Sequence, residues 1–335
     1  FIDFNKKGGE MQKIAVVGAT GYTGFELLRL LSFHDSVKLV LATSEKYSGK
    51  NVSDVFPSLD KYSSLKFEKF IEEKCGDIDL VFCCLPHKVS MNIVPSLLQQ
   101  GSRVIDFSAD YRLKDKEVYQ SWYQIEHKSP EVIEKAVYGM PELYRKEIQN
   151  TQLVANPGCY PTGAILGLVP LAKEGLIDPC SIVIDSKSGV SGAGRKEDLQ
   201  FQFSEINQGF KAYNIANHRH TPEIEQELSN AFGKDVKVTF TPHLIPVTRG
   251  IFSTIYFKAS KEVDLSVINE TLVSFYEKEK FVRIFQNEET LDISHVIGSN
   301  FVDIKVVYDK RTERYIMVTV IDNLVKGASG AAVQN

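Results

Sequence analysis

A strand-like apolar run, a glycine-rich turn and a Leu-rich helical run follow one another near the start of the chain. The run KIAVV leads into Gly18-Ala-Thr-Gly21-Tyr-Thr-Gly24, and FELLRLL follows. Glycine lets the backbone turn tightly and approach a pyrophosphate, whose negative charge is stabilised at the helix N-terminus. The spacing is GxxGxxG and not the commoner GxGxxG, but its place between a strand and a helix predicts a dinucleotide-binding site. A glycine turn without a ligand is the alternative.

Residues 13–110 continue this alternation of strand-like and helical runs. Continuous Val, Ile and Leu runs are typical of strands that are buried on both faces. Alternating β and α patterns indicate a parallel sheet between helices, so we predict an α/β, doubly wound, Rossmann-type domain. The runs, in order, are KIAVV, FELLRLL, VKLVLAT, IDLVFCC, MNIVPSLL and RVIDFS.

The pattern changes after about residue 158. A helix from Pro161 and a later set of strands, with a helix near LSVINETLVSFYE between them, predict an α+β unit. The small-residue segment NLVKGASGAAVQN at the end is expected to form a helix that returns to the first domain.

A chain of 335 residues suits two domains. We expect residues 11–157 with 324–335 to form the NADP-binding domain and residues 158–323 to form the catalytic domain. Residues 1–10 precede Met11 and are expected to be an upstream or added segment outside the fold.

Charge and composition exclude several classes of protein. Lys and Arg number 39 against 43 for Asp and Glu, so the net charge is −4, and this mixture gives little support for nucleic-acid or membrane-surface binding. No apolar run approaches the roughly 20 residues that a membrane-spanning helix needs. The five cysteines are an odd number without paired spacings, which argues against a secreted disulfide framework and favours a cytoplasmic location.

The end of the second strand-like run predicts which dinucleotide is bound. NAD-specific sites carry an acidic residue here that holds the ribose 2′-hydroxyl. This run ends at Ser44, and although Glu45 follows, Lys46 is adjacent. A hydroxyl and a cation suit a 2′-phosphate, so we predict NADP, with a plain loop as the alternative.

Cys159 is the predicted nucleophile. It follows the short strand QLVAN and precedes a helical run in which Pro161 suits the first turn. The dipole and the N–H groups of a helix N-terminus favour the thiolate, which is the reactive form. A buried, inert thiol is the alternative, and we expect Cys83, Cys84 and Cys180 to lie in the core.

The cluster His218-Arg219-His220 lies just before a helix that begins near Thr221-Pro222 and is the best candidate for proton transfer with Cys159. The same histidines could instead cap the helix. No CxxC or HExxH spacing supplies further ligands, so we predict no metal site.

Two other polar segments are candidate ligand-binding loops. Asp106-Phe-Ser108-Ala-Asp110-Tyr-Arg112 follows a buried strand, at the edge of the sheet where such folds bind ligands. Arg112 could bind a phosphate or carboxylate through its planar guanidinium, or form a surface salt bridge. The small-residue loop from Ser188 to Gly194 could let a nicotinamide or substrate approach the backbone, or could be a plain mobile loop.

Together these motifs resemble the N-acetyl-gamma-glutamyl-phosphate reductases, the arginine-biosynthesis branch of the semialdehyde dehydrogenase family. The resemblance spans almost the whole chain from Met11, and the order of the motifs makes it specific. The motifs are GATGYTG, Leu85-Pro86-His87, DFSADYR, Asn156-Pro-Gly-Cys159-Tyr-Pro, GVSGAGR, HRHTPEI, His243-Leu-Ile-Pro-Val-Thr-Arg249-Gly and Asp322-Asn323-Leu-Val-Lys326-Gly-Ala.

The resemblance implies NADPH-dependent reduction of N-acetyl-glutamyl 5-phosphate to the 5-semialdehyde and phosphate, by a homo-oligomer (a dimer or tetramer). It also implies that the α+β unit is the catalytic and dimerisation domain. Cys159 would form a thioester that NADPH reduces, with His218 as acid and base and His220 behind it or on the substrate; the sequence leaves open which histidine does which. The implied cofactor residues are Gly18, Thr20, Gly21, Tyr22, Thr23, Gly24, Ser44, Leu85, Pro86, Gly189, Gly192 and Asn323. The implied substrate residues are Arg112, Ser108, His220 and Arg249.

Three alternatives share part of this pattern. Relatives that act on aspartyl phosphate, or on the longer homologue used in lysine synthesis, share the Cys mechanism, and one methylene distinguishes such substrates by only ~1–3 kcal/mol. A short-chain-type epimerase or reductase needs a Tyr-x-x-x-Lys, but the pairs at 62–66 and 276–280 fall too early and too late in the chain. A protein that only senses NADP would not need a helix-start Cys with a His cluster.

Overall fold

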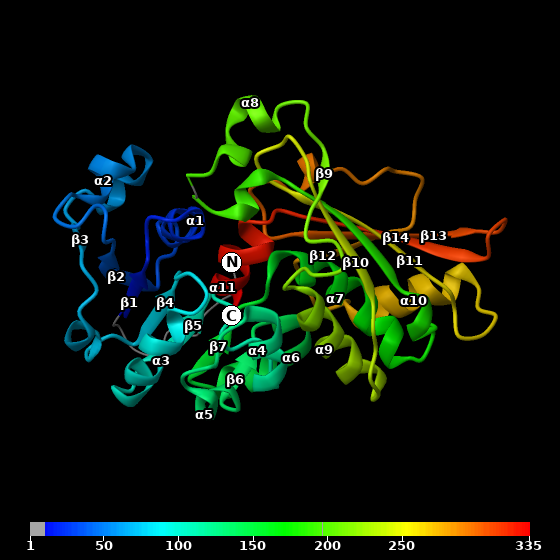
Figure 1. Ribbon diagram of the computed structural model, residues 1–335, viewed down its shortest axis with the longest axis horizontal. Coiled ribbons are helices and arrows are strands. Elements are labelled where there is room, and N and C mark those ends of the chain that lie inside the picture. The colour runs from blue at the N-terminus through cyan, green and yellow to red at the C-terminus, as the bar shows by residue number, and fades with distance from the viewer. Residues whose placement is uncertain (1–10, 196) are drawn as a thin grey trace. The chain divides into compact units, whose positions relative to one another are not determined.

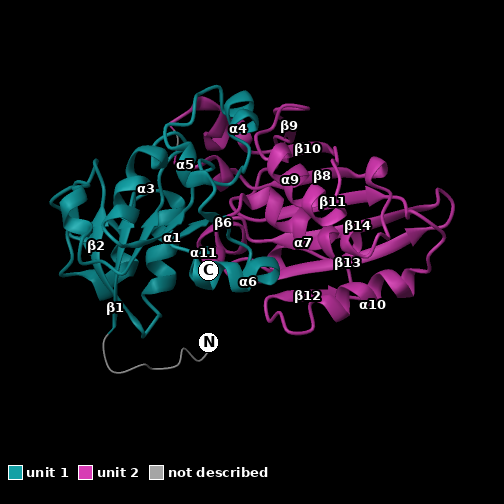
Figure 2. Cartoon of the chain, turned by 90° about the horizontal axis from the view of Figure 1, so that it is seen from below, with its two compact units in different colours: residues 1–156, 332–335 teal, residues 157–331 magenta. Residues whose placement is uncertain are grey.

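The computed structural model describes residues 11–195 and 197–335, so the expectation for residues 1–10 lies outside its described part. The chain forms two compact units (Figure 2). One runs to Asn156 and takes back Ala332–Asn335, and the other is Pro157–Ala331. The first boundary lies one residue before the expected position, whereas the C-terminal return is shorter than the expected residues 324–335.

The first unit contains a sheet of seven strands in the order β3-β2-β1-β4-β5-β7-β6 (Figure 1). All neighbouring strands in it are parallel. The strands are β1 (Gln12–Val17), β2 (Val37–Thr43), β3 (Phe67–Glu68), β4 (Leu80–Cys83), β5 (Arg103–Asp106), β6 (Ala136–Tyr138) and β7 (Leu153–Ala155). Its α-helices are α1 (Tyr22–Leu31), α2 (Val52–Val55), α3 (Ser90–Gln99), α4 (Lys116–Tyr123), α5 (Pro130–Ile133) and α6 (Pro141–Asn150).

Helices cover both faces of this sheet. Successive residues of a strand point to opposite faces, and in β1 Ala15 and Val17 belong to the core that includes α3, whereas Ile14 and Val16 belong to the core that includes α1. Because both sets are buried, the strand reads as a continuous apolar run. The predicted doubly wound domain is confirmed.

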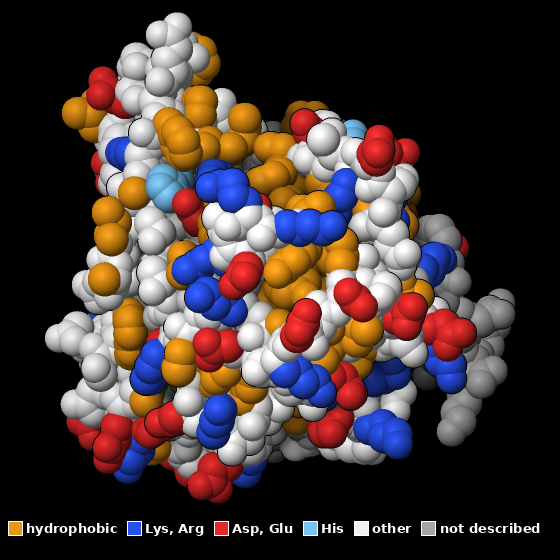
Figure 3. Space-filling view, turned by 90° about the vertical axis from the view of Figure 1, so that its right-hand side faces the viewer, with side chains coloured by type: hydrophobic (Ala, Val, Ile, Leu, Met, Phe, Trp, Pro, Cys, Tyr) orange, Lys and Arg blue, Asp and Glu red, His pale blue; other side chains and the backbone are white. Residues whose placement is uncertain are grey.

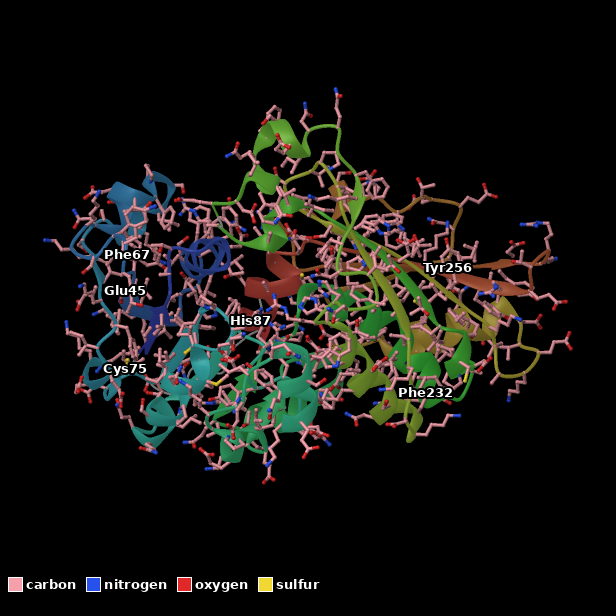
Figure 4. All side chains as sticks on the ribbon, in the orientation of Figure 1. Glu45, Phe67, Cys75, His87, Phe232 and Tyr256 are labelled. Carbon is pink, nitrogen blue, oxygen red and sulfur yellow. The ribbon has the colours of Figure 1, made fainter. Side chains whose placement is uncertain are left out.

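The strand order places a switch point between β1 and β4. From β1 the chain moves to β2 on one side, and it later places β4 on the other side. Ligands of doubly wound sheets bind outside the carboxyl ends of the strands at such a point. The glycine turn after β1 and the loop after β4, which contains His87 (Figure 4), both begin there.

The second unit contains a mixed sheet of seven strands in the order β12-β13-β14-β11-β8-β10-β9. Two of its strand pairs, β8 with β10 and β12 with β13, are parallel, and the other neighbours are antiparallel. The strands are β8 (Val183–Ser188), β9 (Lys211–Ala212), β10 (Thr239–Leu244), β11 (Ile251–Phe257), β12 (Val282–Phe285), β13 (Val302–Asp309) and β14 (Arg314–Ile321). Its α-helices include α7 (Cys159–Lys173), α8 (Phe203–Ile206), α9 (Thr221–Phe232) and α10 (Leu265–Phe275).

Helix α7 is the centre of the second unit and packs on β11, β14 and α9. Nearly all of its residues are buried. Close approach to β14 depends on small residues: a Cβ on Gly163 would lie 2.8 Å from Thr319 Oγ1, and one on Gly167 would lie 2.5 Å from Met317 Sδ. This packing fixes where the first residue of α7, Cys159, lies.

The structure differs from the sequence-based expectations at several points. The helix expected from Pro161 begins at Cys159. The final segment is not one helix but a π-helical turn, Val325–Ser329, followed by α11 (Gly330–Gln334). Cys180 is exposed, so its expected place in the core is wrong; it lies in a short 3-10 turn before β8. On the face shown in Figure 3, Lys and Arg side chains are interspersed with Asp and Glu.

Candidate active site

The three glycines of the turn after β1 have different surroundings. Gly18 has a φ of +81°, and a Cβ there would lie 2.5 Å from the carbonyl oxygen of Cys84. A Cβ on Gly24 would lie 2.6 Å from the carbonyl carbon of Ala19, so this glycine allows the helix to pack closely on the turn. A Cβ on Gly21 would have no described heavy atom within 4 Å. Gly21 is also the N-cap of α1, so the open space lies where a helix N-terminus favours a pyrophosphate.

Ser44 joins the end of β2 to the glycine turn. Its buried hydroxyl lies 3.0 Å from the hydroxyl of Thr20, and it accepts the N–H of Tyr47 over 3.2 Å. Glu45 (Figure 4) and Lys46 are both exposed, and the Lys46 ammonium lies 5.8 Å from the centre of the Tyr47 ring. The residue that directly follows β2 therefore carries a hydroxyl group and not the carboxylate that is typical of an NAD-specific site.

The loop after β4 is held by the loop after β5. The Ala109 N–H donates to Nδ1 of His87 over 2.9 Å. Asp110, which is fully buried, accepts the N–H groups of Lys88 at 2.8 Å and Met91 at 3.2 Å. The Asp110 carboxylate thereby fixes the start of α3 and the loop before it. That loop contains the predicted cofactor residues Leu85 and Pro86.

Asp106 and Ser108 form a buried pair at the end of β5. The Ser108 hydroxyl donates to Oδ2 of Asp106 over 2.6 Å, and the Ser108 N–H donates to Oδ1 over 3.2 Å. Burial raises the pKa of Asp106 to about 6, although hydrogen bonds from Ser108 and Ser90 act in the other direction. The side chain of Ser108, a predicted substrate residue, is therefore directed at a buried carboxylate.

Arg112 is buried, so the alternative of a surface salt bridge is wrong. Its Nε donates to the carbonyl of Asn156 over 2.7 Å, and its Nη2 donates to the carbonyl of Phe107 over 2.7 Å. Arg112 thus links the loop after β5 to the loop after the neighbouring strand β7. A long cation that is held in this way gives the edge of the sheet a fixed positive charge.

Cys159 begins α7, and two side chains hold the residue before it. The N-cap Gly158 donates its N–H to Oε1 of Glu223 over 2.7 Å and accepts the Thr162 hydroxyl at its carbonyl over 2.9 Å. Glu223 is buried in the first turn of α9. The half-buried Cys159 therefore lies at a helix N-terminus, as predicted, at a position that a second helix anchors.

Aromatic rings enclose His218. The ring centres of Tyr160, Tyr213 and Phe240 lie 5.4, 5.5 and 5.4 Å from that of His218, and the ring of His220 lies 4.9 Å away. This burial lowers the pKa of His218 to about 4, and the positive charge of the neighbouring Arg219 adds to the effect. His218 is therefore neutral at pH 7.

The backbone selects one form of the neutral His218 ring. The His220 N–H donates to Nδ1 of His218 over 3.1 Å. Because Nδ1 accepts this bond, the proton of the neutral ring is on Nε2. His220 itself is the N-cap residue of α9, but within the described part of the chain its side chain donates or accepts no capping hydrogen bond there, so the alternative that these histidines cap the helix gains no support.

Two tyrosines connect the surroundings of His218 with Cys159. The hydroxyls of Tyr160 and Tyr213 lie 2.9 Å apart. Burial raises the pKa of both phenols, that of Tyr213 to about 12, and the charge of a Cys159 thiolate raises both further. The thiol and the two hydroxyls are thus close enough to interact electrostatically.

A second polar cluster brings together the predicted residues of the loop after β8. Asn323 accepts the Gly250 N–H at Oδ1 over 2.8 Å and donates from Nδ2 to Ser191 Oγ over 2.9 Å. A Cβ on Gly189 would lie 2.8 Å from the backbone N of Arg249, and one on Gly192 would lie 3.8 Å from Nδ2 of Asn323. Gly189, Gly192, Asn323 and Arg249 therefore share one region of the second unit.

The sequence analysis missed several residues of this arrangement. Glu223 accepts a hydrogen bond from Gly158. The rings of Tyr160 and Tyr213 lie against that of His218, and Asp322 pairs with Arg249 over 3.2 Å. A signal for Glu223 was present, because it is an acidic residue directly after Pro222 in the first turn of an expected helix. The roles of Tyr213 and Asp322 depend on long-range pairing of strands and carry no local signal.

The other cysteines have different surroundings. Cys75 and Cys83 are fully buried, and burial raises the pKa of both thiols and that of Cys84. Within residues 11–195 and 197–335, no group of three or more His, Cys, Asp and Glu side chains could hold a metal ion. None of the helices in the described part of the chain is both long enough and apolar enough to cross a membrane.

The fold and the site define a class of α/β protein in which a Rossmann-type dinucleotide-binding unit is joined to a unit that carries a helix-start cysteine and a buried histidine. The chain belongs to the semialdehyde dehydrogenase family. The NAD binding domain of that family matches residues 13–151, and its dimerisation domain matches residues 159–323. The resemblance seen in the motifs is confirmed.

Named relatives are similar over nearly the whole chain. The N-acetyl-gamma-glutamyl-phosphate reductase of Geotalea daltonii is 50% identical over 327 residues, which cover 97% of this chain and 94% of that protein. The enzyme of the same name from Pelotomaculum thermopropionicum is 51% identical over 324 residues, which cover 96% and 93%.

Solved structures show the same fold at low identity. Aspartate semialdehyde dehydrogenase II from Vibrio cholerae has a TM-score of 0.73 at 18% identity, with 97% of each chain covered. Aspartate semialdehyde dehydrogenase with NADP from Candida albicans has a TM-score of 0.66 at 17% identity, again with 97% of each chain covered.

Proposed function

We propose that the protein reduces N-acetyl-L-glutamyl 5-phosphate with NADPH to N-acetyl-L-glutamate 5-semialdehyde and phosphate, a reaction of arginine biosynthesis. The observation that carries this proposal is a half-buried Cys159 at the start of α7, beside Tyr160 and Tyr213, which enclose a neutral His218. The named relatives that share half of its residues support the choice of substrate.

The first step uses Cys159 as a nucleophile. Its thiolate attacks the acyl carbon, the bond from that carbon to the phosphate oxygen breaks, and phosphate leaves with the bonding electrons. The N-terminus of α7 favours the thiolate before the attack. The product is a thioester on Cys159, so that one difficult reaction is divided into two easier ones.

The second step reduces the thioester. NADPH, when it is bound, supplies the hydride. Nε2 of His218 carries a proton and is suited to donate a hydrogen bond to the oxygen that becomes negative as the carbonyl carbon is reduced. The electron pair on that oxygen then re-forms the carbonyl as the C–S bond breaks, which releases the aldehyde and returns the thiolate of Cys159, while the proton stays on Nε2 of His218.

The described residues fit a dinucleotide. The open space at Gly21 and the N-terminus of α1 suit the pyrophosphate, and the hydroxyl of Ser44 with the nearby cation of Lys46 suits a 2′-phosphate. A related fold has been solved with NADP. We assign the cofactor to Gly18, Thr20, Gly21, Tyr22, Thr23, Gly24, Ser44, Leu85, Pro86, Gly189, Gly192 and Asn323.

The anionic substrate needs cationic and polar partners. Arg112, Arg249, His220 and Ser108 are the proposed ones. Arg112 and Arg249 also have protein partners in Asn156 and Asp322. Such guanidinium groups are held in place before the substrate binds, which reduces the cost of ordering them.

We further propose that the first unit is the NADP-binding domain and that the second is the catalytic domain.

We also propose that the protein is cytoplasmic and forms a homodimer or a dimer of dimers. In β11 alternate residues are buried, and Phe252, Thr254 and Tyr256 (Figure 4) are half-buried on the other face of the strand. A second copy would cover that face. Light scattering tests this proposal: a monomer mass at micromolar concentration would contradict it.

Substrate identity is tested in the reverse direction. NADPH formation is followed with NADP, phosphate and either N-acetyl-glutamate semialdehyde or aspartate semialdehyde. We expect phosphate-dependent turnover that prefers the acetylated aldehyde. A preference for aspartate semialdehyde, or for a longer aminoadipate-type semialdehyde, would assign the protein to a sister enzyme with the same mechanism.

A further inference from the structure

The π-helical turn Val325–Ser329 presents its backbone to the predicted nucleophile. A Cβ on Gly327 would lie 2.8 Å from Cβ of Cys159, 3.1 Å from its Cα and 3.4 Å from Cδ1 of Ile321. Carbon atoms in contact are normally ~3.5–4.0 Å apart. The crowded atoms of Cys159 belong to the start of α7 and not to the tip of a flexible side chain, so they can move only with the helix backbone.

Space, and not conformational freedom, is what requires glycine at this position. Gly327 is not among the glycines with positive φ, so its backbone is open to any residue. The segment is also buried throughout. Alanine would therefore be tolerated by the backbone angles of Gly327, and the nearest atoms that would resist its methyl group belong to Cys159 and Ile321.

Asp322 holds this turn in place. Its fully buried carboxylate accepts the N–H of Leu324 at Oδ1 over 2.8 Å, and its carbonyl oxygen accepts the N–H of Gly327 over 3.0 Å. The same carboxylate accepts the Gly298 N–H over 2.7 Å and pairs with Nε of Arg249 over 3.2 Å. Backbone that is bonded at so many points forms a rigid surface.

We propose that Gly327 is a positioning residue of the reaction: its backbone is the surface that fixes Cys159 at the N-terminus of α7, and Asp322 keeps that surface in place. The inference rests on the proposed function in one respect, namely that Cys159 is the nucleophile. A displacement of about 1 Å at a reacting atom can lower a rate by about 100-fold. The contact predicts a displacement of this size if a methyl group is added.

The test compares Gly327→Ala with Gly330→Ala. A Cβ on Gly330, whose φ is −70°, would lie closest to Oδ1 of Asn300 and 2.5 Å from Cγ1 of Val325, so this control is at least as crowded as Gly327 but does not face Cys159. The readout is the rate at which iodoacetamide modifies Cys159 in cofactor-free protein, determined by peptide mass spectrometry. We expect modification to be slower by about 10-fold or more in Gly327→Ala, with a larger loss in kcat, and to be unchanged in Gly330→Ala.

Two results would overturn the proposal: a wild-type rate of modification in Gly327→Ala, or an equal loss in both variants. If Gly327→Ala gives no folded protein, Asp322→Asn takes its place, because it weakens the hydrogen bonds that hold the turn without adding volume. An unchanged rate of Cys159 modification in that variant also overturns the proposal. Modification of the thiol needs no acyl phosphate. A wrong substrate assignment would therefore alter turnover and leave this comparison intact.

Discussion

Oε1 of Glu223 accepts a hydrogen bond from the backbone N–H of Gly158 over 2.7 Å and thereby joins the first turn of α9 to the residue that precedes Cys159. His218 and His220 lie immediately before α9, so one short segment orients both the nucleophile and the histidine pair. A charge-assisted bond of this kind contributes about 1.5–3 kcal/mol.

Loss of this bond should reduce catalysis. We expect Glu223→Ala to lower kcat/KM by about 10-fold to 100-fold, because the turn before Cys159 is no longer held. Glu223→Gln keeps an acceptor oxygen of the same size and should retain most of the activity. Equal activity of Glu223→Ala and the wild type in steady-state assays would contradict this role.

The pKa of His218 should make stability depend on pH. The folded-state pKa is about 4, below the ordinary value of 6.5, so the stability that a neutral His218 contributes is present above pH 6.5 and is lost as the pH falls towards 4. The contribution is at most about 3 kcal/mol. The measurement is the free energy of unfolding of the wild type minus that of His218→Asn, in urea at several pH values.

This difference should decrease steadily from pH 7 to pH 4. A difference that does not vary with pH would mean that His218 titrates normally in the folded protein. Titration of the His218 ring by NMR gives an independent value, and a midpoint near 6.5 would contradict the enclosure of the ring.

Ser44 should determine the choice between NADP and NAD. Ser44→Asp places a carboxylate where we expect the 2′-phosphate, and like charges repel, so KM for NADP should rise by about 10-fold or more while KM for NAD falls. Ser44→Ala is the matched control, because it removes the contact with Thr20 without adding charge. If Ser44→Asp and Ser44→Ala have the same NADP preference, the 2′-phosphate is bound elsewhere.

Replacement by alanine should have different effects at two glycines of the same turn. A Cβ on Gly24 would lie 2.6 Å from backbone atoms of Ala19, so Gly24→Ala should lower the free energy of unfolding by about 1–3 kcal/mol. Gly21→Ala meets open space and should leave Tm unchanged, yet weaken NADP binding by about 10-fold, because its methyl group occupies the expected position of the pyrophosphate. Calorimetry with and without NADP separates the two effects, and unchanged NADP affinity in Gly21→Ala would place the pyrophosphate elsewhere.

Local patterns allowed much of the fold to be predicted. The order of strand, glycine turn and helix in residues 13–31 and the continuous apolar runs after it predicted a parallel sheet with helices on both faces, because burial on both sides demands such runs. The start of a helix near Cys159 was likewise readable from Gly158 and Pro161.

The structural features that the sequence did not reveal depend on long-range contacts. The two-residue strand β9 forms only because β10 lies beside it, and its residues carry no strand pattern. The π-helical turn near Gly327 is set by the buried carboxylate of Asp322 and not by helix propensity. The sequence left open whether Arg112 binds an anion or forms a surface salt bridge, and only the pairing of β5 with β7 shows that it is buried against backbone carbonyls.

The central claim is that a thioester forms on Cys159, and it is tested most directly without NADPH. Protein is mixed with N-acetyl-glutamyl phosphate, phosphate release is followed in the first turnover, and the acyl group is located by peptide mass spectrometry. The account predicts one phosphate released per active site, an acyl adduct on the peptide that contains Cys159, and neither in Cys159→Ser. Phosphate release that survives in Cys159→Ser, or an adduct on another residue, would contradict it.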